Sequence, residues 1–383
     1  MKKSGSACTD GMTAPGEHPS LSQYFATIFP GKVRKIAVNA GLGCPNRDGT
    51  ISTGGCIFCN NAAFVPRYAL GHEKENSGNR PPLSDCPGKS VPGITCKSVP
   101  GITEQIDRGI EFSRGKGQVW GYLPYFQSYS NTYGDTRHLI GLYEEALSHP
   151  GVVGLVIATR PDCLSPDLLD YFERRFGQHI EQYIRWRTAG RLPDAPMQPQ
   201  WRTDRPYLLV ELGIESTNDD TLLRINRGHN FACCRDAVRA LAERGIDVGA
   251  HIILGLPGEG PDDYVLHAER LSGLPLRTLK LHHLQVVKNT TLEQMYRQNP
   301  DIVHLFTPEE YAATVHMFLN HLRSDIVLDR FVTETPPGMV VAPAWGLKPS
   351  EFQALLRQYP TESVKQSGHL CSLPCQEADI DEL

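Results

Sequence analysis

Three cysteines lie close together in one glycine-rich loop near the start of the chain. Cys44, Cys56 and Cys59 follow the spacing C-x11-C-x2-C, directly after a short apolar run. Three thiolates can bind three irons of a 4Fe-4S cubane, and the fourth iron then stays open to another ligand. Glycines at 41, 43, 49, 54 and 55 allow the backbone to turn tightly around a bulky group. The spacing therefore favours an iron-sulfur site.

The same spacing leaves two other interpretations open. A Cys-x2-Cys pair is also half of a zinc site, for which His72 or Cys86 is a candidate fourth ligand. Against zinc, the chain has no second Cys-x2-Cys pair, and Cys371 with Cys375 forms only a Cys-x3-Cys pair that supplies too few ligands. Buried structural thiols are the third interpretation.

Composition and charge restrict the class of protein. The 383 residues are 40% hydrophobic and 21% charged, which is typical of a globular chain long enough for one large domain with appendages. Eleven cysteines cannot all pair within one chain, so we read them as free thiols or metal ligands in a reducing compartment. No window of 18 apolar residues occurs and the start is polar, which predicts a cytoplasmic protein with no membrane partner. A net charge of -5 gives no global attraction to nucleic acid, so RNA binding would need a local basic patch.

Apolar strand-like runs alternate with helical stretches along most of the chain. The predicted strands cover residues 35–39, 118–123, 152–158, 207–212, 247–254 and 278–287. The predicted helices cover residues 103–114, 135–148, 165–176, 231–244 and 261–271. Because parallel neighbours need helical crossovers, this alternation predicts an α/β fold with a parallel barrel or open sheet. Functional residues then belong at the carboxyl ends of the strands.

Two stretches interrupt this alternation and suggest the domain limits. The first, residues 70–101, is rich in Gly, Pro and Ser, and the second, residues 177–205, interleaves arginine with tryptophan. Arginine with tryptophan suits a phosphate backbone and stacked bases, but a solvated surface insertion is the favoured interpretation. The expected organisation is a tail at 1–20, a barrel at 21–290 that carries both insertions, a C-terminal extension at 291–360 and a tail at 361–383.

The cysteine loop and a series of later blocks resemble one known family. The blocks are YFQSYSNTY at 125–133, TRPD at 159–162, VELGIES at 210–216, INRGH at 225–229, HIILGLPGE at 251–259, LHHLQVVK at 281–288, and RF at 330–331 through WG at 345–346. In this order they resemble the YhcC-like radical S-adenosylmethionine (SAM) proteins, which are related to the catalytic subunit of Elongator. The similarity runs from about residue 20 to about residue 350, apart from the two insertions.

The resemblance implies a fold and a cofactor site. The fold is a partial (β/α)6 barrel of the TIM-like, radical SAM type, with a small C-terminal α/β extension. The three cysteines would bind the 4Fe-4S cluster, and the amino and carboxylate groups of SAM would bind its open iron. By the same resemblance, Gln127 contacts the SAM amino group, Glu215 the ribose, and Ile253 with Gly255 the adenine. No catalytic residue is assigned.

Several other residues in the family blocks are candidates for substrate contact. His282 and His283 lie next to each other on a predicted strand, so only one of them is expected to reach the barrel interior. Arg227, His229 and Lys288 could hold an anionic group, and capping or surface roles fit them as well.

The resemblance also implies a reaction. A reduced cluster would cleave SAM to a 5'-deoxyadenosyl radical that abstracts hydrogen from a substrate, and the electron would come from a reductant such as flavodoxin or ferredoxin. Kinship with Elongator suggests RNA as the substrate, as a side chain on a tRNA wobble uridine. A two-carbon addition is doubtful, because only about 100 residues follow the sixth strand and no acetyl-transfer domain is expected among them. A small-molecule or peptide substrate and a non-catalytic iron-sulfur or zinc regulatory protein remain open alternatives.

Overall fold

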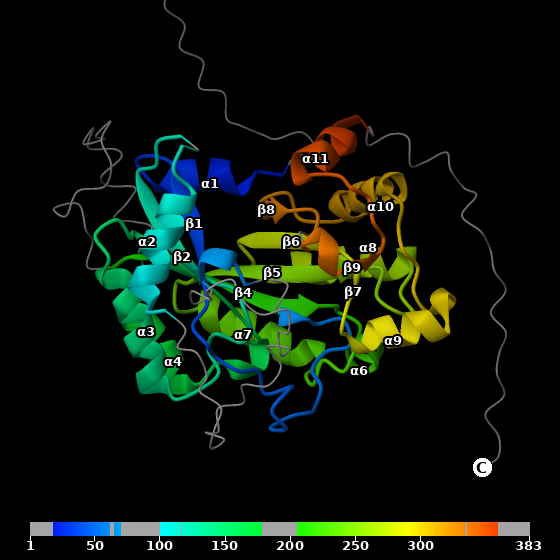
Figure 1. Ribbon diagram of the computed structural model, residues 1–383, viewed down its shortest axis with the longest axis horizontal. Helices are drawn as coiled ribbons and strands as arrows, with labels where there is room; N and C mark the ends of the chain where they lie inside the picture. The colour runs from blue at the N-terminus through cyan, green and yellow to red at the C-terminus, as the bar shows by residue number, and fades with distance from the viewer. Residues whose placement is uncertain are drawn as a thin grey trace, which may run out of the picture.

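One parallel sheet of seven strands forms the frame of the molecule (Figure 1). The computed structural model describes residues 18–61, 65–69, 100–115, 117–177, 205–333 and 335–358. The strands are β1 (Val33–Val38), β2 (Gly121–Phe126), β3 (Gly154–Thr159), β4 (Tyr207–Glu215), β5 (Asp247–Leu254), β6 (Thr278–His283) and β8 (Val327–Arg330). All six neighbouring pairs are parallel. The prediction of an α/β partial barrel is therefore confirmed.

The sheet holds one strand more than the six predicted. The seventh, β8, pairs with β6 and comes from the range that the sequence assigned to a C-terminal extension. A segment near the N-terminus also contacts β8, because Leu328 donates its backbone N–H to the carbonyl of Pro19 at 2.8 Å. The predicted strand at 278–287 is in fact two strands, since β6 ends at His283 and the short β7 (Val286–Val287) pairs antiparallel with β9 (Val340–Ala342).

Helices cover the outer face of the sheet. The crossover helices are α2 (Ile102–Phe112), α3 (Thr136–Ser148), α4 (Pro166–Phe176), α7 (Phe231–Ala242), α8 (Pro261–Ser272) and α10 (Pro308–Asn320). A capping residue begins α4, because the Ser165 hydroxyl accepts from the backbone N–H of Leu168, with proline at the first helical position. Their apolar faces and the outward-facing strand residues form the largest buried cluster. The remaining helices are α6 (Asp219–Arg224), α9 (Thr291–Gln298) and α11 (Pro349–Gln358).

A second buried cluster closes the inner face at the amino ends of the strands. The helix α1 (Leu21–Ile28) supplies Phe25, and Phe29 follows it, to pack against Trp120 and Tyr207. The Tyr207 ring meets both phenylalanines edge-on, with centroids 5.7 and 5.5 Å away. Because one end of the curled sheet is filled in this way, the opposite end, where the strands terminate, is left for function.

Some predictions fall on residues that the structure does not describe. Most of the insertions at 70–101 and 177–205, most of both predicted tails, and His72, Cys86, Cys371 and Cys375 lie outside the described residues. Within the described part of the chain, no helix has both the length and the apolar character needed to cross a membrane.

Candidate functional site

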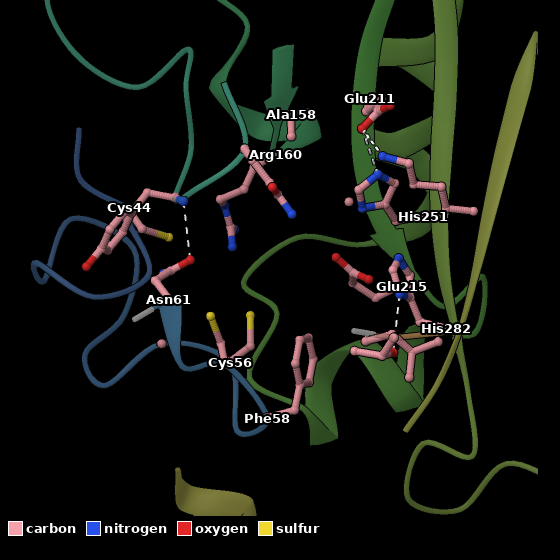
Figure 2. Close-up of a pocket in the computed structure, with 18 of the residues that line it drawn as sticks. Cys44, Cys56, Phe58, Asn61, Ala158, Arg160, Glu211, Glu215, His251 and His282 are labelled. Atoms are coloured by element: carbon pink, nitrogen blue, oxygen red, sulfur yellow. Dashed lines mark hydrogen bonds and ion pairs between the residues drawn. The ribbon is translucent and has the colours of Figure 1, made fainter. Parts of the chain in front are cut away.

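A cavity of about 220 Å³ lies at the carboxyl ends of the strands. On one side it is bounded by the loop after β1, residues 39–61, which we call the cysteine loop (Figure 2). On the other side it is bounded by side chains at or near the ends of the strands. The predicted site residues that line it are Cys44, Cys56, Cys59, Gln127, Glu215 and Ile253. Residues spread over more than 200 positions of sequence thus share one cavity.

The cysteine loop is fixed to the body of the protein by hydrogen bonds. The Asn226 side chain, from the segment after α6, donates to the carbonyl of Gly55 at 2.9 Å, and Asn46 donates back to the carbonyl of Asn226 at 2.5 Å. Gly55 has φ +82°, and a Cβ there would lie 2.8 Å from Nε of Arg47. Arg47 in turn donates to the carbonyl of Cys59 at 3.1 Å. Glycine is therefore favoured at position 55, both by the backbone conformation and by the nearby Arg47 side chain.

The three thiols sit in surroundings that would suit a metal-bound thiolate. Burial raises the pKa of Cys59 to about 12, and the nearby Cys56 adds to the rise while Arg47 opposes it. Cys56 is buried and accepts from Nη1 of Arg227 at 3.4 Å and from the Asn46 amide at 3.5 Å. Bound iron would supply the positive charge that stabilises buried thiolates, and N–H donors around the sulfur are the usual outer partners of such ligands.

The arrangement fits a cluster better than a single ion. Among the described residues, no three His, Cys, Asp or Glu side chains converge closely enough to hold one metal ion. All three cysteines instead line the cavity, and Figure 2 shows Cys44 and Cys56 at separate positions of the cysteine loop. In a cubane each cysteine binds a different iron, so the sulfurs need not meet at one point, and an all-thiolate donor set suits iron-sulfur chemistry. The residues present therefore fit a 4Fe-4S cluster.

Two non-glycine residues with left-handed backbones lie at the rim of the cavity. Tyr129 has φ 67° and Glu215 has φ 69°. Glu215 follows an irregularity in the β4–β5 register, and its carboxylate lies 3.6 Å from Nη2 of Arg227. The backbone N–H of Tyr129 donates to Asn61 of the cysteine loop at 3.2 Å. Such conformations cost free energy and gather at functional sites, where surrounding contacts maintain them.

A group of buried and partly buried charged and polar side chains lies on the side of the cavity that faces the cysteines. This charged cluster consists of Lys35, Glu211, His251, Lys280 and Asp329. Both lysines contact both carboxylates, with N···O distances from 2.5 to 3.4 Å. Burial alone would raise the pKa of Glu211, but Lys280 and Lys35 outweigh it and hold that pKa well below its usual value. Glu211, His251 and Lys280 line the cavity.

Comparison with protein-family models matches most of the described chain. Residues 38–271 match the model described as Radical SAM superfamily, and residues 276–360 match the Radical_SAM C-terminal domain. The chain belongs to the radical SAM superfamily. Radical SAM proteins use a 4Fe-4S cluster and SAM, and as enzymes they need a reductant. Membership thus decides between the cluster and the zinc site that the cysteine spacing had left open.

Individual relatives agree with this assignment. The Escherichia coli (strain K12) protein named Protein YhcC is 29% identical over 315 residues, which cover 82% of each chain. The Dehalococcoides mccartyi protein named tRNA uridine(34) acetyltransferase is 33% identical over 92 residues, which are 23% of this chain and 20% of that protein. Among solved structures, the archaeal Methanocaldococcus infernus Elp3 with an N-terminal deletion has a TM-score of 0.53 at 16% identity, covering 68% of this chain and 58% of that one. This last likeness is one of fold.

The radical SAM fold brings most of the predicted residues together, with three differences. Gly255 does not line the cavity; its φ is +96°, and a Cβ there would lie 3.1 Å from Phe306 and 3.2 Å from the carbonyl of His304. Packing therefore accounts for this glycine, and its contact with adenine remains a prediction. His229 and Lys288 also do not line the cavity, whereas Arg227 does.

The expectation that only one of two adjacent histidines reaches the interior is wrong. Both His282 and His283 line the cavity. His283 is the last residue of β6, where strand alternation ends, and its ring stacks on Trp345 with centroids 3.9 Å apart. Burial is the main cause that holds the pKa of His282 well below its usual value, and burial lowers the pKa of His283 to about 3. Both rings are therefore neutral at pH 7.

The sequence analysis did not single out one buried arginine that lines this cavity. Arg160 is 3% exposed, lines the cavity, and forms a two-point pair with Asp162 at 2.8 and 2.7 Å. It also donates to the carbonyl of Arg227 at 2.8 Å, which ties the end of β3 to the segment that supports Cys56. The TRPD block at 159–162 could have indicated this arginine, but the sequence of a block does not reveal whether one of its side chains is buried.

Proposed function

We propose that this protein is a radical SAM enzyme in which Cys44, Cys56 and Cys59 bind the 4Fe-4S cluster. One observation carries the proposal: all three thiols line the same cavity as side chains at the carboxyl ends of the strands. The fourth iron would remain free for SAM, since no fourth cysteine lines the cavity among the described residues. The cluster and SAM, when bound, supply the electron and the 5'-deoxyadenosyl radical that abstracts hydrogen from a substrate.

The other cavity residues bind and orient under this proposal. Gln127 lies just beyond β2 and offers an amide to the SAM amino group, while Glu215 offers carboxylate oxygens to the ribose hydroxyls. Ile253 on β5 offers an apolar surface for the adenine ring. These contacts hold SAM between the cysteine loop and the strands, where the surrounding protein limits access of water to the reacting groups.

We further propose that the substrate is RNA, specifically a side chain on a tRNA wobble uridine. The local similarity to a protein named tRNA uridine(34) acetyltransferase supports this choice. A second candidate is a small molecule or peptide, and the net charge of -5 favours it, because a phosphate backbone is attracted to a positive surface. The protein would work in the cytoplasm with a reductant such as flavodoxin or ferredoxin.

The cluster and its cleavage chemistry are tested together under anaerobic conditions. The full chain is reconstituted with iron and sulfide, SAM and dithionite are added, and 5'-deoxyadenosine is quantified. The proposal expects iron and sulfide near four of each per chain and continuous formation of 5'-deoxyadenosine. Zinc in place of iron, together with no 5'-deoxyadenosine, would refute it.

The RNA proposal has its own test. Modified nucleosides in tRNA are compared by mass spectrometry between a strain that lacks the gene and its parent. A nucleoside missing at the wobble position, and restored by a plasmid copy, is the expected result. An unchanged nucleoside profile would exclude tRNA and leave the small-molecule or peptide candidate.

A further inference from the structure

A histidine on the side of the cavity opposite the cysteines is held by a buried carboxylate. Nε2 of His251, on β5, lies 3.2 Å from Oε2 of Glu211, on β4. The His251 side chain lines the cavity and is 19% exposed, whereas the Glu211 side chain is 1% exposed. Figure 2 shows the His251 ring beside the Glu211 carboxylate, on the side of the cavity that faces the cysteines. Glu211 is therefore the buried member of the pair, and His251 is the member that is accessible from the cavity.

Glu211 is ionised and already has its hydrogen-bond partners. Lys280 donates to Oε2 at 2.5 Å and Lys35 donates to Oε1 at 3.1 Å. Because these two lysines hold the pKa of Glu211 well below its usual value, the carboxylate does not take up a proton near pH 7. Glu211 can thus orient a neighbour and stabilise its positive charge, but it is not itself a proton acceptor.

The hydrogen bond to Glu211 fixes the protonation pattern of the neutral imidazole. An ionised carboxylate only accepts, so Nε2 of His251 carries the hydrogen and Nδ1 presents a lone pair. Within the described part of the chain, Nδ1 has no hydrogen-bond partner. The nearby His282 ring, 5.5 Å away by centroids, is itself held by Thr333, whose hydroxyl oxygen lies 3.3 Å from its Nδ1. His251 is therefore a pre-oriented proton acceptor facing the cavity.

We propose that His251 is the proton-transfer residue of this site and that Glu211 is its positioning residue. This rests on the proposed function, since the substrate must enter the same cavity. Nδ1 of His251 takes a proton from an O–H or N–H group of the substrate, and the electrons of the broken bond stay on the substrate oxygen or nitrogen. The imidazolium charge that forms lies beside the Glu211 carboxylate. The substrate class is a molecule whose reacting part carries such a donor, for example a hydroxyl or a pyrimidine imide.

Charged and titratable side chains from neighbouring strands surround His251. Glu211 from β4 and Lys280 and His282 from β6 are its titratable neighbours, and Arg330 at the end of β8 acts on His282. Glu211→Gln removes the negative charge that stabilises the imidazolium, so the rate of product formation is expected to fall.

The first test needs no substrate. The full, cluster-loaded chain is labelled with 15N-histidine, and the signals of His251 are assigned with His251→Gln. The proposal expects the Nε2–H tautomer in the wild type and a change in that signal pattern in Glu211→Gln. A wild-type Nδ1–H tautomer would overturn it, because Nδ1 would then have no lone pair for the substrate.

The second test compares product with SAM cleavage. Total tRNA and the small-molecule fraction of a strain that lacks the gene serve as two separate probes, and both product and 5'-deoxyadenosine are measured. For His251→Gln, the product formed per 5'-deoxyadenosine is expected to fall about 10²–10⁴-fold. His304→Gln, an exposed histidine away from the cavity, is the matched control and is expected to behave as wild type.

The outcomes separate the two proposals. If only the small-molecule fraction yields product, the RNA proposal fails, and the His251 comparison is made on that fraction. If neither probe yields product, the substrate proposal fails, and the tautomer measurement alone decides the role of His251. If His251→Gln lowers 5'-deoxyadenosine and product equally, the residue positions SAM, and proton transfer by His251 is refuted.

Discussion

The two sides of the cavity are built in opposite ways. The cysteine loop is a single short segment whose shape comes from glycines and from hydrogen bonds to Asn226. The five members of the charged cluster come from β1, β4, β5, β6 and β8. Ion pairs hold the lysines and carboxylates together, and a hydrogen bond to Glu211 holds His251. Chemistry on the loop side depends on a bound group, whereas chemistry on the strand side uses the charges of the chain itself. Substitutions on the two sides should therefore impair the protein in different ways.

The largest expected effect is on the loop side. Cys44→Ala, Cys56→Ala or Cys59→Ala should each abolish 5'-deoxyadenosine formation, because two thiolates are too few to hold the cluster beside an open iron. Iron content and product are measured after reconstitution. Cys371→Ala is the control and should keep both. A single cavity cysteine whose loss leaves cleavage intact would disprove its assignment as a ligand.

The next largest effect is on the strand side and concerns stability. Glu211→Gln leaves Lys35 and Lys280 with too little negative charge, so the free energy of unfolding should fall by about 3–5 kcal/mol. Chemical denaturation measures it. The matched control is Glu144→Gln, which breaks the partly exposed pair with Arg175 and should cost less than about 1 kcal/mol. Equal losses in the two variants would mean that the charged cluster contributes no more than a surface pair.

The same variant has a defined pH signature. The pKa of Glu211 is depressed in the folded protein, so its stabilising contribution is fully present above the unfolded-state value, about 4.3. That contribution is lost only as pH falls through the lower folded-state value. The stability difference between wild type and Glu211→Gln should therefore be constant from pH 7 to about pH 5 and shrink below about pH 4. A difference that grows as pH falls would contradict this sign.

A moderate effect is expected where Arg227 links the thiol of Cys56 with Glu215. Arg227→Gln removes a positive charge and an N–H donor 3.4 Å from the Cys56 sulfur, so the reduced, more negative cluster is less stable. Iron should be retained, the midpoint potential should become more negative, and SAM cleavage should fall about 10–100-fold. Redox titration followed by electron paramagnetic resonance measures the potential. Arg224→Gln, outside the cavity, should leave it unchanged; an unchanged potential in Arg227→Gln would refute the coupling.

The smallest effect separates backbone strain from packing in the cysteine loop. Gly54 and Gly55 both have φ +82°, so alanine at either should cost about 1–2 kcal/mol. Only at Gly55 does the new Cβ meet Arg47, at 2.8 Å from Nε, whereas nothing lies within 4 Å at Gly54. Gly55→Ala should therefore lose stability and iron content beyond Gly54→Ala. Equal losses would mean that Arg47 moves aside freely.

The loop side and the strand side also differ in what the sequence could reveal. Cys44, Cys56 and Cys59 could be proposed as ligands from the sequence because they lie close together in one loop, with a spacing that suits a metal or cluster site. Lys35 and Asp329, paired at 2.6 Å, are 294 residues apart, and each looks like an ordinary surface charge in sequence. Their ion pair depends on which strands lie in the sheet, and β8, which carries Asp329, was not predicted as a strand. The apolar runs indicated six strands of the barrel, but periodicity cannot show which polar residues face one another.

The open iron of the cluster is tested most directly by its contact with SAM. The reconstituted, reduced chain is mixed with SAM labelled with 15N in the amino group and 17O in the carboxylate, and electron-nuclear double resonance spectra are recorded. Coupling of both labels to the cluster is predicted for the wild type, with Cys56→Ala giving no cluster signal. A wild-type cluster spectrum that SAM leaves unchanged, with no coupling to either label, would contradict the assignment.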